Sequence, residues 1–310
     1  MLTISKEHVT DTLQGGQVPA AFCRSGDTVA FETRDCYDDN DITEDNPYGT
    51  RKGGLENPAT GPLYVNGAEP GDILKVEIRK IRLREYGIMR TSATNGAFHH
   101  LYQDKTARKF YFETNGETGK EGFWFDDSLW LDCDPMIGVI GTAPEKEGIV
   151  TITPGVHGGN MDCNKITAGS ALYLPVFVPG ALLSMGDLHA RMGDGEVLIC
   201  GLETAGTVTV QVTVLKAANN PVIQKTLPLL KSKDKLMTIQ SAETIDEAAR
   251  LAAKQMQQLV KGMTGLDDVN SGMLMSLLSD LVICQIVNPL QTVRCEFPEA
   301  AIQMYGGRLP

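Results

Sequence analysis

Short apolar or alternating runs, separated by Gly, Pro, Asn and Asp, follow one another from residue 17 to about residue 215. Runs of roughly 4–8 residues bounded by turn residues are typical of β-strands. We expect strands at 28–33, 73–81, 149–153, 171–178, 196–200 and 207–215. Strands of this kind must bury one sheet face against another layer. The sequence therefore predicts a mainly β domain over residues 1–215, with a β-sandwich or barrel-like core.

The character of the sequence changes towards helix after this domain. A capping box at 244–247 is followed by apolar residues at helical spacing until Gly262, where we expect the helix to end. A second apolar segment, 273–287, has the length of a buried helix but ends in β-branched residues, so its helix–strand boundary stays open. We expect residues 216–310 to form an α+β C-terminal part with one or two helices, packed on the β-rich domain.

Composition excludes several classes of function. The net charge is −11, the pI is near 5.0 and Lys and Arg form no cluster, so we expect no nucleic-acid partner. No stretch approaches the roughly 20 apolar residues of a membrane span, and the first residues lack the apolar core of a signal peptide. This predicts a cytoplasmic protein without a membrane partner. The seven cysteines show no C-x-x-C spacing and are expected to be reduced, mostly buried thiols.

Residues 155–203 hold two of the five histidines and five carboxylates between short apolar runs. Side chains two apart in a strand point to one face, so Asp187 and His189 should converge, as should Asp194 and Glu196 after the intervening turn. Imidazole and carboxylate ligands suit zinc or another divalent ion of intermediate hardness. The pattern indicates metal-dependent hydrolase chemistry, although Asp and Gly in a GDGE turn also suit a plain turn.

Five ordered segments carry a resemblance to a known family. They are GPLYVNGAEPGDILKVEI at 61–78, PMIGVIGTAP at 135–144, PGVHGGNMD at 154–162, LYLPVFVPGALLSMGDLHARMGDGEV at 172–197 and LLSDLVICQIVNP at 277–289. In this order and spacing the chain resembles the acetamidase/formamidase family. The resemblance implies a mostly β architecture with an α/β C-terminal part, and hydrolysis of short amides such as formamide or acetamide to the carboxylate and ammonia. It also implies a divalent metal, zinc with calcium possible, and we expect a homo-oligomer.

The candidate site residues lie in these segments, except for Glu203, in the GLE that follows the fourth segment, and Asp35. The expected metal ligands are Asp187 and His189, completed by His157 or Asp162. The expected general base and acid are Glu203 and Glu196. Residues expected to bind substrate or to support the ligands are Asn160, Asp194 and, outside the matched segments, Asp35. A bound divalent ion lowers the pKa of its water towards about 7 and polarises a carbonyl, and a carboxylate can then relay the proton.

Several residues also have a structural interpretation. A histidine in a β protein often has no ligand role, and Asp or Asn in a turn often binds backbone amides. Asp280 lies in an apolar run and is expected to be either a paired core carboxylate or a catalytic one. Cys163 is either an activated nucleophile or a buried thiol. No Gly-x-Ser-x-Gly elbow supports a serine mechanism.

The polar, acidic segment 36–64 is too long for a simple connection, which favours an active-site loop or a mobile surface loop. The pair His99 and His100 follows in an irregular stretch and receives no role. Two other functions remain open. One is a non-catalytic β protein that binds a metal or a small ligand, and the other is an amidohydrolase acting on another nitrogenous substrate.

Overall fold

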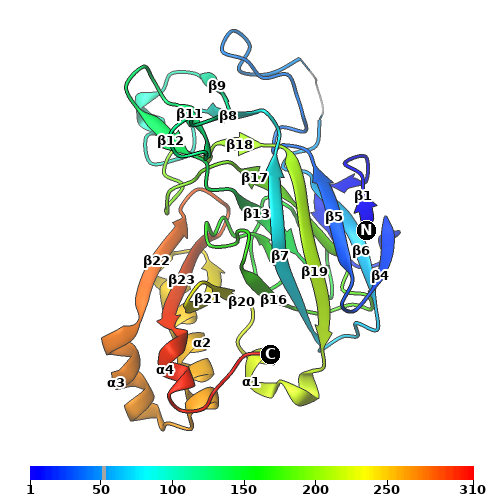
Figure 1. Cartoon of the computed structure of the whole chain (residues 1–310), viewed down its shortest axis with the longest axis vertical. Helices are drawn as coiled ribbons and strands as arrows, with labels where there is room; N and C mark the ends of the chain where they lie inside the picture. Colours follow the sequence, from blue (N-terminus) through cyan, green and yellow to red (C-terminus); the bar gives the residue numbers. More distant parts are fainter. Residues whose placement is uncertain (51–53) are drawn as a thin grey trace.

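The computed structural model describes residues 1–50 and 54–310, and within these residues two large β-sheets form most of the molecule (Figure 1). The first sheet has nine strands. In spatial order they are β1 (Leu2–Ile4), β5 (Thr28–Thr33), β19 (Gly206–Leu215), β7 (Ile73–Leu83), β16 (Ala171–Pro175), β20 (Leu229–Ser232), β21 (Lys235–Ala242), β23 (Gln291–Pro298) and β22 (Asp280–Gln285).

The second sheet carries most of the candidate site. Its main path runs through β15 (Gly158–Asn160), β13 (Met136–Gly141), β17 (Leu183–His189), β18 (Glu203–Thr204), β8 (Tyr86–Arg90) and β9 (Ala107–Tyr111). Strand β6 (Ala59–Asn66) also pairs with β17, and β2 (Val9–Thr10) and β4 (Ala21–Arg24) pair with β6. Smaller sheets join β10 (Glu113–Thr114), β11 (Glu121–Trp124) and β12 (Trp130–Asp132), and β3 (Thr12–Leu13) with β14 (Ile149–Val150).

The main core lies between the two large sheets. Phe31 and Val208 of the first sheet belong to the same buried cluster as Ile140 and Leu183 of the second. Burying a side chain of this size stabilises the fold by about 1.5–3 kcal/mol. Neither sheet closes on itself in its strand order. The mainly β class with helices in the C-terminal part is therefore confirmed, and the sheets pack as layers rather than as a closed barrel.

Strand predictions hold best where apolar and polar residues alternate. Strand β5 matches the expected 28–33, β7 and β19 differ from expectation only at their ends, and β14 and β16 are shorter than expected. The expected strand at 196–200 is wrong. Glu196 and Ile199 have φ angles of 47° and 130°, and the Gly195 amide donates to the Cys284 carbonyl at 2.9 Å. Because extended strands require negative φ, this segment forms turns instead.

Helix α2 (Ile245–Thr264) begins as predicted, with the Thr244 hydroxyl accepting the Glu247 amide at 3.2 Å. It does not end at Gly262, as expected, but continues to Thr264, where Gly265 adopts a φ of 75°. A Cβ at Gly262 would lie 2.5 Å from the Val222 side chain, so this glycine serves close packing inside the helix rather than its termination. The helix covers β21 and β23.

The segment 273–287 divides into the second half of α3 (Asp268–Leu278), then β22 and a turn. It is not a buried helix, since Met273 and Leu277 are exposed. Asp280 is neither buried nor in the candidate site. Its carboxylate lies on the surface, 3.0 Å from Lys235 Nζ, so both interpretations offered for it are wrong.

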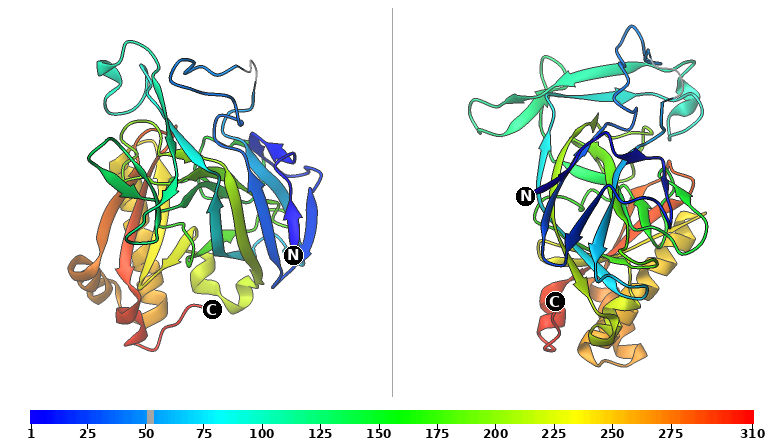
Figure 2. Two further views of the ribbon diagram at one scale, coloured as in Figure 1. Left: turned by 45° about the horizontal axis from the view of Figure 1, so that its top comes forward. Right: turned by 90° about the vertical axis from the view of Figure 1, so that its right-hand side faces the viewer.

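The remaining helices are short: α1 (Pro221–Gln224), α4 (Glu299–Gln303), and the 3₁₀ turns η1 (His99–Leu101) and η2 (Ala217–Asn219). Helices α1 to α4 gather at one end of the molecule, whereas β8, β9 and their loops lie at the other (Figures 1 and 2). In the described residues no helix has both the length and the apolar character to cross a bilayer. The first sheet continues across residue 215 through β16 and β20, and the expected domain division there stays a prediction.

Candidate active site

A cluster of acidic residues surrounds one histidine where β17 and β18 meet. Asp187 and His189 come from the last three residues of β17, and Glu203 pairs with His189 across the ladder to β18. Asp162 follows β15, and Glu196 lies on the turn after β17. These five side chains are almost fully buried. The fold thus brings together residues from four separate points of the sequence.

The distances within the cluster are short. Nε2 of His189 lies 3.1 Å from Glu203 Oε1, 3.4 Å from Asp187 Oδ1 and 3.9 Å from Asp162 Oδ1. The ligand atoms of Asp162, His189 and Glu196 all lie within 4.8 Å of one another, and so do those of Cys36, Asp187 and Glu203. Each set has the spacing of groups that could hold one metal ion.

Three of these carboxylates belong to residues whose backbone φ angle is positive. Asp162, Asp187 and Glu196 have φ angles of 43°, 55° and 47°. Residues other than glycine adopt positive φ uncommonly, at a cost of order 1–3 kcal/mol when the surroundings enforce it. Such conformations gather at functional sites, and here all three place a carboxylate in one cluster.

Two glycines leave the space that the cluster occupies. A Cβ on Gly138 of β13 would lie 2.5 Å from Asp162 Oδ1 and 2.5 Å from Asp187 Oδ2. A Cβ on Gly201 would lie 2.6 Å from His189 Nδ1. Both distances are well inside van der Waals contact, so any larger residue would displace a member of the cluster.

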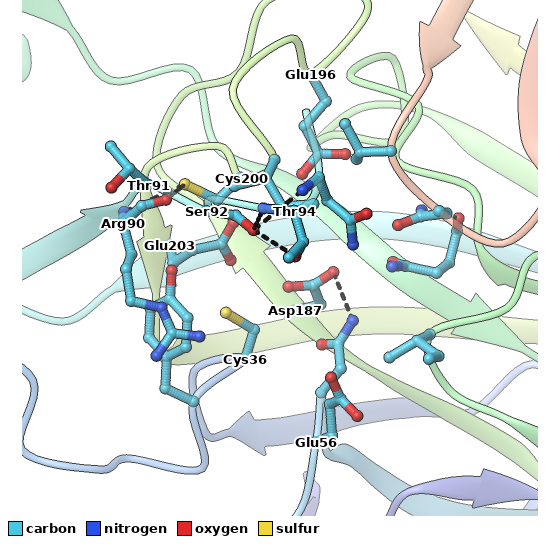
Figure 3. Close-up of a pocket in the computed structure, with 18 of the residues that line it drawn as sticks. Cys36, Glu56, Arg90, Thr91, Ser92, Thr94, Asp187, Glu196, Cys200 and Glu203 are labelled. Atoms are coloured by element: carbon cyan, nitrogen blue, oxygen red, sulfur yellow. Dashed lines mark hydrogen bonds between the residues drawn. The ribbon is translucent and has the colours of Figure 1, made fainter. Parts of the chain in front are cut away.

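Two asparagines hold the outer carboxylate oxygens. Asn288 Nδ2 donates to Asp162 Oδ2 at 2.6 Å and to the Asn160 carbonyl at 3.0 Å. Asn57 Nδ2 donates to Asp187 Oδ2 at 3.2 Å (Figure 3). Each of these carboxylates therefore keeps its other oxygen for the centre of the cluster.

The inner polar atoms lack hydrogen-bond partners. These buried atoms are Asn160 Oδ1, Asp162 Oδ1, Glu196 Oε2, Glu203 Oε2 and both ring nitrogens of His189. Buried polar atoms rarely lack a hydrogen-bond partner, and most of the atoms named here are hydrogen-bond acceptors. Acceptors that converge without a donor are what a divalent cation requires, and one imidazole with several carboxylates suits zinc, while the oxygen-rich composition also suits calcium. The residues present therefore fit the metal that the resemblance implies.

Burial controls the ionisation of the cluster. It raises the pKa of Asp162 to about 6 and that of Glu203 to about 7, and with Asp162 it raises the pKa of Glu196 well above the usual range. Burial lowers the pKa of His189, but the charges of Glu203 and Asp187 outweigh this effect and raise it well above its usual range. A cluster in which ionised carboxylates are this costly is stabilised by a compensating cation.

A pocket of about 550 Å³ opens onto the cluster. Asp187, Glu196 and Glu203 point into it in Figure 3. The acidic segment 36–64 reaches its wall at two places, through Cys36 with Tyr37 and through Glu56 with Asn57. Within the described residues the segment is thus part of the pocket wall, as an active-site loop would be.

Comparison with known proteins identifies the family. The model of the acetamidase/formamidase family matches residues 16–147 and 142–244, which together span more than half of the chain. The chain belongs to the acetamidase/formamidase family. The resemblance seen in the sequence is therefore confirmed.

Two curated relatives of this family are formamidases by name. The formamidase of Methylophilus methylotrophus is 39% identical over 248 residues, which cover 62% of this chain and 60% of the relative. A putative formamidase of Schizosaccharomyces pombe is 31% identical over 217 residues, 51% of each chain. The matched part of the chain thus spans only about half to 60% of the length of these relatives.

Solved structures of acetamidases share the whole fold. The acetamidase of Bacillus halodurans is 43% identical, with a TM-score of 0.91 over 98% of this chain and 100% of that one. The acetamidase of Yersinia enterocolitica is 25% identical, with a TM-score of 0.83 over 97% of this chain and 93% of that one. The layered β architecture is therefore that of the acetamidase/formamidase family.

In this family member, six of the nine expected site residues lie at the cluster or pocket: Asn160, Asp162, Asp187, His189, Glu196 and Glu203. His157 does not lie in either ligand group, although we expected it to complete the metal site. Its ring is buried between Gly155 and Gly159, both ring nitrogens lack partners, and burial lowers its pKa to about 4. The ring therefore packs against the loop that carries it and not against the cluster.

Asp194 and Asp35 also lie apart from the cluster. Asp194 forms a two-pronged ion pair with the buried Arg294, at 2.5 and 2.9 Å, which fixes the turn on β23. It therefore does not converge with Glu196, as the spacing of two residues had suggested. Asp35 accepts the backbone amides of Tyr37 and Asp39 at 3.0 and 2.9 Å and pairs with Arg84, so it shapes the start of the acidic segment.

The structure also shows where the cysteines and the two neighbouring histidines lie. Cys163 is fully buried and does not line the pocket, which supports the buried-thiol interpretation. All seven cysteines are free of disulfides, five of them buried. His99 and His100 lie exposed on η1, away from the pocket wall.

Sequence analysis missed Cys36, Asn57, Gly138 and Asn288. Gly138 and Asn288 lie in two of the five matched segments, so the segments themselves marked them, but a lone Gly or Asn has no chemistry that reveals its role. Cys36 and Asn57 lie far apart in the acidic segment, and only the fold shows that both reach the site.

Proposed function

We propose that this chain hydrolyses the C–N bond of linear amides to a carboxylate and ammonia, at the cluster around His189. The observation that supports this most is the set of buried acceptors without donors that faces a pocket of about 550 Å³. The family and the names of its relatives add the reaction class. Short amides such as formamide and acetamide are the first substrates to test.

We further propose that the cluster holds a divalent metal, most consistent with zinc. Asp162, His189 and Glu196 would hold it, with the group of Cys36, Asp187 and Glu203 adjacent. When bound, such an ion supplies Lewis acidity for the amide carbonyl and lowers the pKa of water. His189 must be neutral to act as a ligand. Its Nε2 lies 3.4 Å from Asp187 and 3.1 Å from Glu203, so this nitrogen would be the one that binds the metal.

Glu203 is the proposed general base and acid. Its carboxylate lines the pocket, and burial raises its pKa to about 7, which suits both taking a proton from water and giving it to the leaving nitrogen. Glu196 also lines the pocket and is the alternative. Asn160 presents an unpaired Oδ1, which can accept an N–H of the substrate amide.

Ammonia release from formamide, acetamide and propionamide tests this proposal, together with elemental analysis before and after chelation and metal return. We expect near-stoichiometric metal, loss of turnover on chelation and recovery on metal return. Turnover that persists without metal would contradict the metal mechanism but not the amidase activity. Bound metal without turnover of these or larger amides would favour a binding protein instead.

A cytoplasmic location and a homo-oligomer remain proposals for this chain. Sedimentation of the purified protein over a range of concentrations tests the second, and a monomer throughout would contradict it. No argument about the site depends on either property.

A further inference from the structure

The wall of the active-site pocket carries two cationic side chains that the proposed chemistry does not use. Arg90 ends β8, and Lys105 lies on the segment that leads into β9. Both are half-buried, and both line the pocket that contains Asp187 and Glu203. Neither forms an ion pair with a carboxylate anywhere in residues 1–50 and 54–310.

Neutral groups hold both cations in place. The guanidinium of Arg90 lies 4.3 Å from the centre of the Tyr37 ring and donates to the Pro47 carbonyl at 3.5 Å. Nζ of Lys105 lies 5.5 Å from the centre of the Tyr48 ring. An aromatic face orients a cation without neutralising it. The aromatic rings therefore orient the two charges, and no ion pair in the described residues neutralises either of them.

The two cations also influence each other. Burial is the largest cause that lowers the pKa of Lys105, and repulsion from Arg90 is next, ahead of the opposing attraction of Glu56 and Asp104. Glu56 lines the same pocket but is exposed, so solvent screens it. Half-buried cations that repel each other are stabilised by an anion between or beside them.

The size of the pocket exceeds what a short amide needs. About 550 Å³ lies within the roughly 300–1,000 Å³ of pockets that hold drug-sized ligands, whereas each water takes about 30 Å³ of liquid. Formamide or acetamide would leave most of this space to water. The additional wall is polar, since Thr91, Ser92, Thr94 and Asn95 also line the pocket.

We propose that the preferred substrates are amides that carry a carboxylate at the end opposite the reacting amide, such as the monoamides of short dicarboxylic acids, with Lys105 and Arg90 binding that carboxylate. This rests on the proposed amidase function of the same pocket. In the reaction, the oxygen of water forms a bond to the amide carbon, the C–N bond breaks, and one proton of the water goes to the nitrogen, which leaves as ammonia. The second proton leaves the new carboxylic acid and is taken up by the ammonia to give ammonium. The product is a dicarboxylate.

Kinetics with matched substrates test this inference. Succinamate carries the anionic end, and succinamide has the same chain length with a neutral amide there. We expect kcat/KM for succinamate to exceed that for succinamide by at least tenfold, because a charge-assisted hydrogen bond changes a binding constant by about 10- to 100-fold. The Lys105→Gln substitution should reduce this ratio about tenfold, and Lys105→Glu should reduce it further.

Lys109→Gln is the matched control. Lys109 is also half-buried, and its Nζ lies 4.5 Å from the centre of the Tyr86 ring, but it does not line the pocket. This control should keep the wild-type ratio. Equal ratios in wild type, Lys105→Gln and Lys109→Gln, with succinamide hydrolysed, would overturn the inference while leaving the amidase function intact.

Calorimetry separates the two proposals if no amide is hydrolysed. Succinate, the expected product, is titrated into wild type, Lys105→Gln and Lys109→Gln. We expect about tenfold weaker binding in Lys105→Gln alone. Loss of binding in that variant without any turnover would keep the anion site and reject the amidase function, whereas equal binding in all three proteins would overturn the anion site.

Discussion

His189 and Glu203 face each other across the β17–β18 ladder with Nε2 and Oε1 3.1 Å apart, yet neither His189 ring nitrogen has a hydrogen-bond partner. At this distance a proton between the two atoms would ordinarily form a well-aligned bond. The absence of alignment shows that both side chains are oriented towards a shared centre rather than towards each other. The surrounding acids, Asp162 and Glu196, are oriented in the same way.

His189→Ala should lose both metal and activity. The imidazole belongs to the ligand group with Asp162 and Glu196, and it also separates carboxylates that would otherwise repel one another. We expect turnover to fall at least 100-fold and the metal content, measured by elemental analysis, to fall below half of the wild-type value. His99→Ala, at an exposed histidine outside the pocket, is the control. Full retention of both properties in His189→Ala would contradict the assignment.

Gly138→Ala should disrupt the site without adding any polar group. The new methyl would lie 2.5 Å from both Asp162 Oδ1 and Asp187 Oδ2, so at least one carboxylate must move. Overpacking of this kind costs about 1–3 kcal/mol of unfolding free energy, and we expect metal content to fall with it. Urea denaturation and elemental analysis measure the two effects. Gly116→Ala, where no atom lies within 4 Å of the added Cβ, should change neither, and an unaltered Gly138→Ala protein would refute the steric argument.

The sequence predicts the site best where two ligands share one strand. The structure brings Asp187 and His189 together as expected, although a φ of 55° at Asp187 shows that its conformation is not that of a regular strand. The same reasoning fails for Asp194 and Glu196, because a φ of 98° at Gly195 and 47° at Glu196 breaks the alternation. Asp194 then turns towards Arg294, a partner 100 residues away. The local backbone conformation therefore decides whether two side chains two residues apart face each other, and the period of two alone does not reveal it.

The other residues that the sequence did not reveal depend on contacts between residues far apart in the chain. Asn288 binds Asp162 over a separation of 126 residues, and Asn57 binds Asp187 over 130. No local pattern contains such information. The same limit applies to Gly262, which reads as a helix stop but provides space for Val222 of α1.

Protonation of His157 should destabilise the protein in mild acid. Burial lowers its pKa in the folded state to about 4, below the roughly 6.5 of an unfolded chain, so between these values the unfolded state binds more protons. The stability that neutral His157 provides is complete above about pH 6.5 and is lost as the pH falls towards 4, by up to about 3 kcal/mol.

Urea denaturation at pH 7.5 and pH 5 measures this loss in wild type and in His157→Phe. The substitution keeps a planar aromatic ring, although a larger one, and cannot take up a proton, so the difference between the two pH values should shrink by about 2 kcal/mol. His100→Phe, at an exposed site, should behave as wild type. Metal content should persist in His157→Phe, since His157 lies outside both ligand groups, and loss of metal would restore it as a candidate ligand.

Arg294→Met should show that the turn carrying Glu196 depends on the ion pair between the buried Arg294 and the exposed Asp194. Arg294 is almost fully buried and donates to Asp194 at 2.5 and 2.9 Å and to Glu296 at 2.7 Å. Removing one partner of a fully buried pair costs about 3–5 kcal/mol, and we expect about 3 kcal/mol here, because Asp194 is exposed and Glu296 keeps its pair with Lys235. Turnover should fall because Asp194 no longer fixes the turn. Arg250→Met removes the exposed pair with Asp246 and should cost less than about 0.5 kcal/mol. Urea denaturation and ammonia release compare the two variants, and equal effects would show that the Asp194–Arg294 pair does not hold the site together.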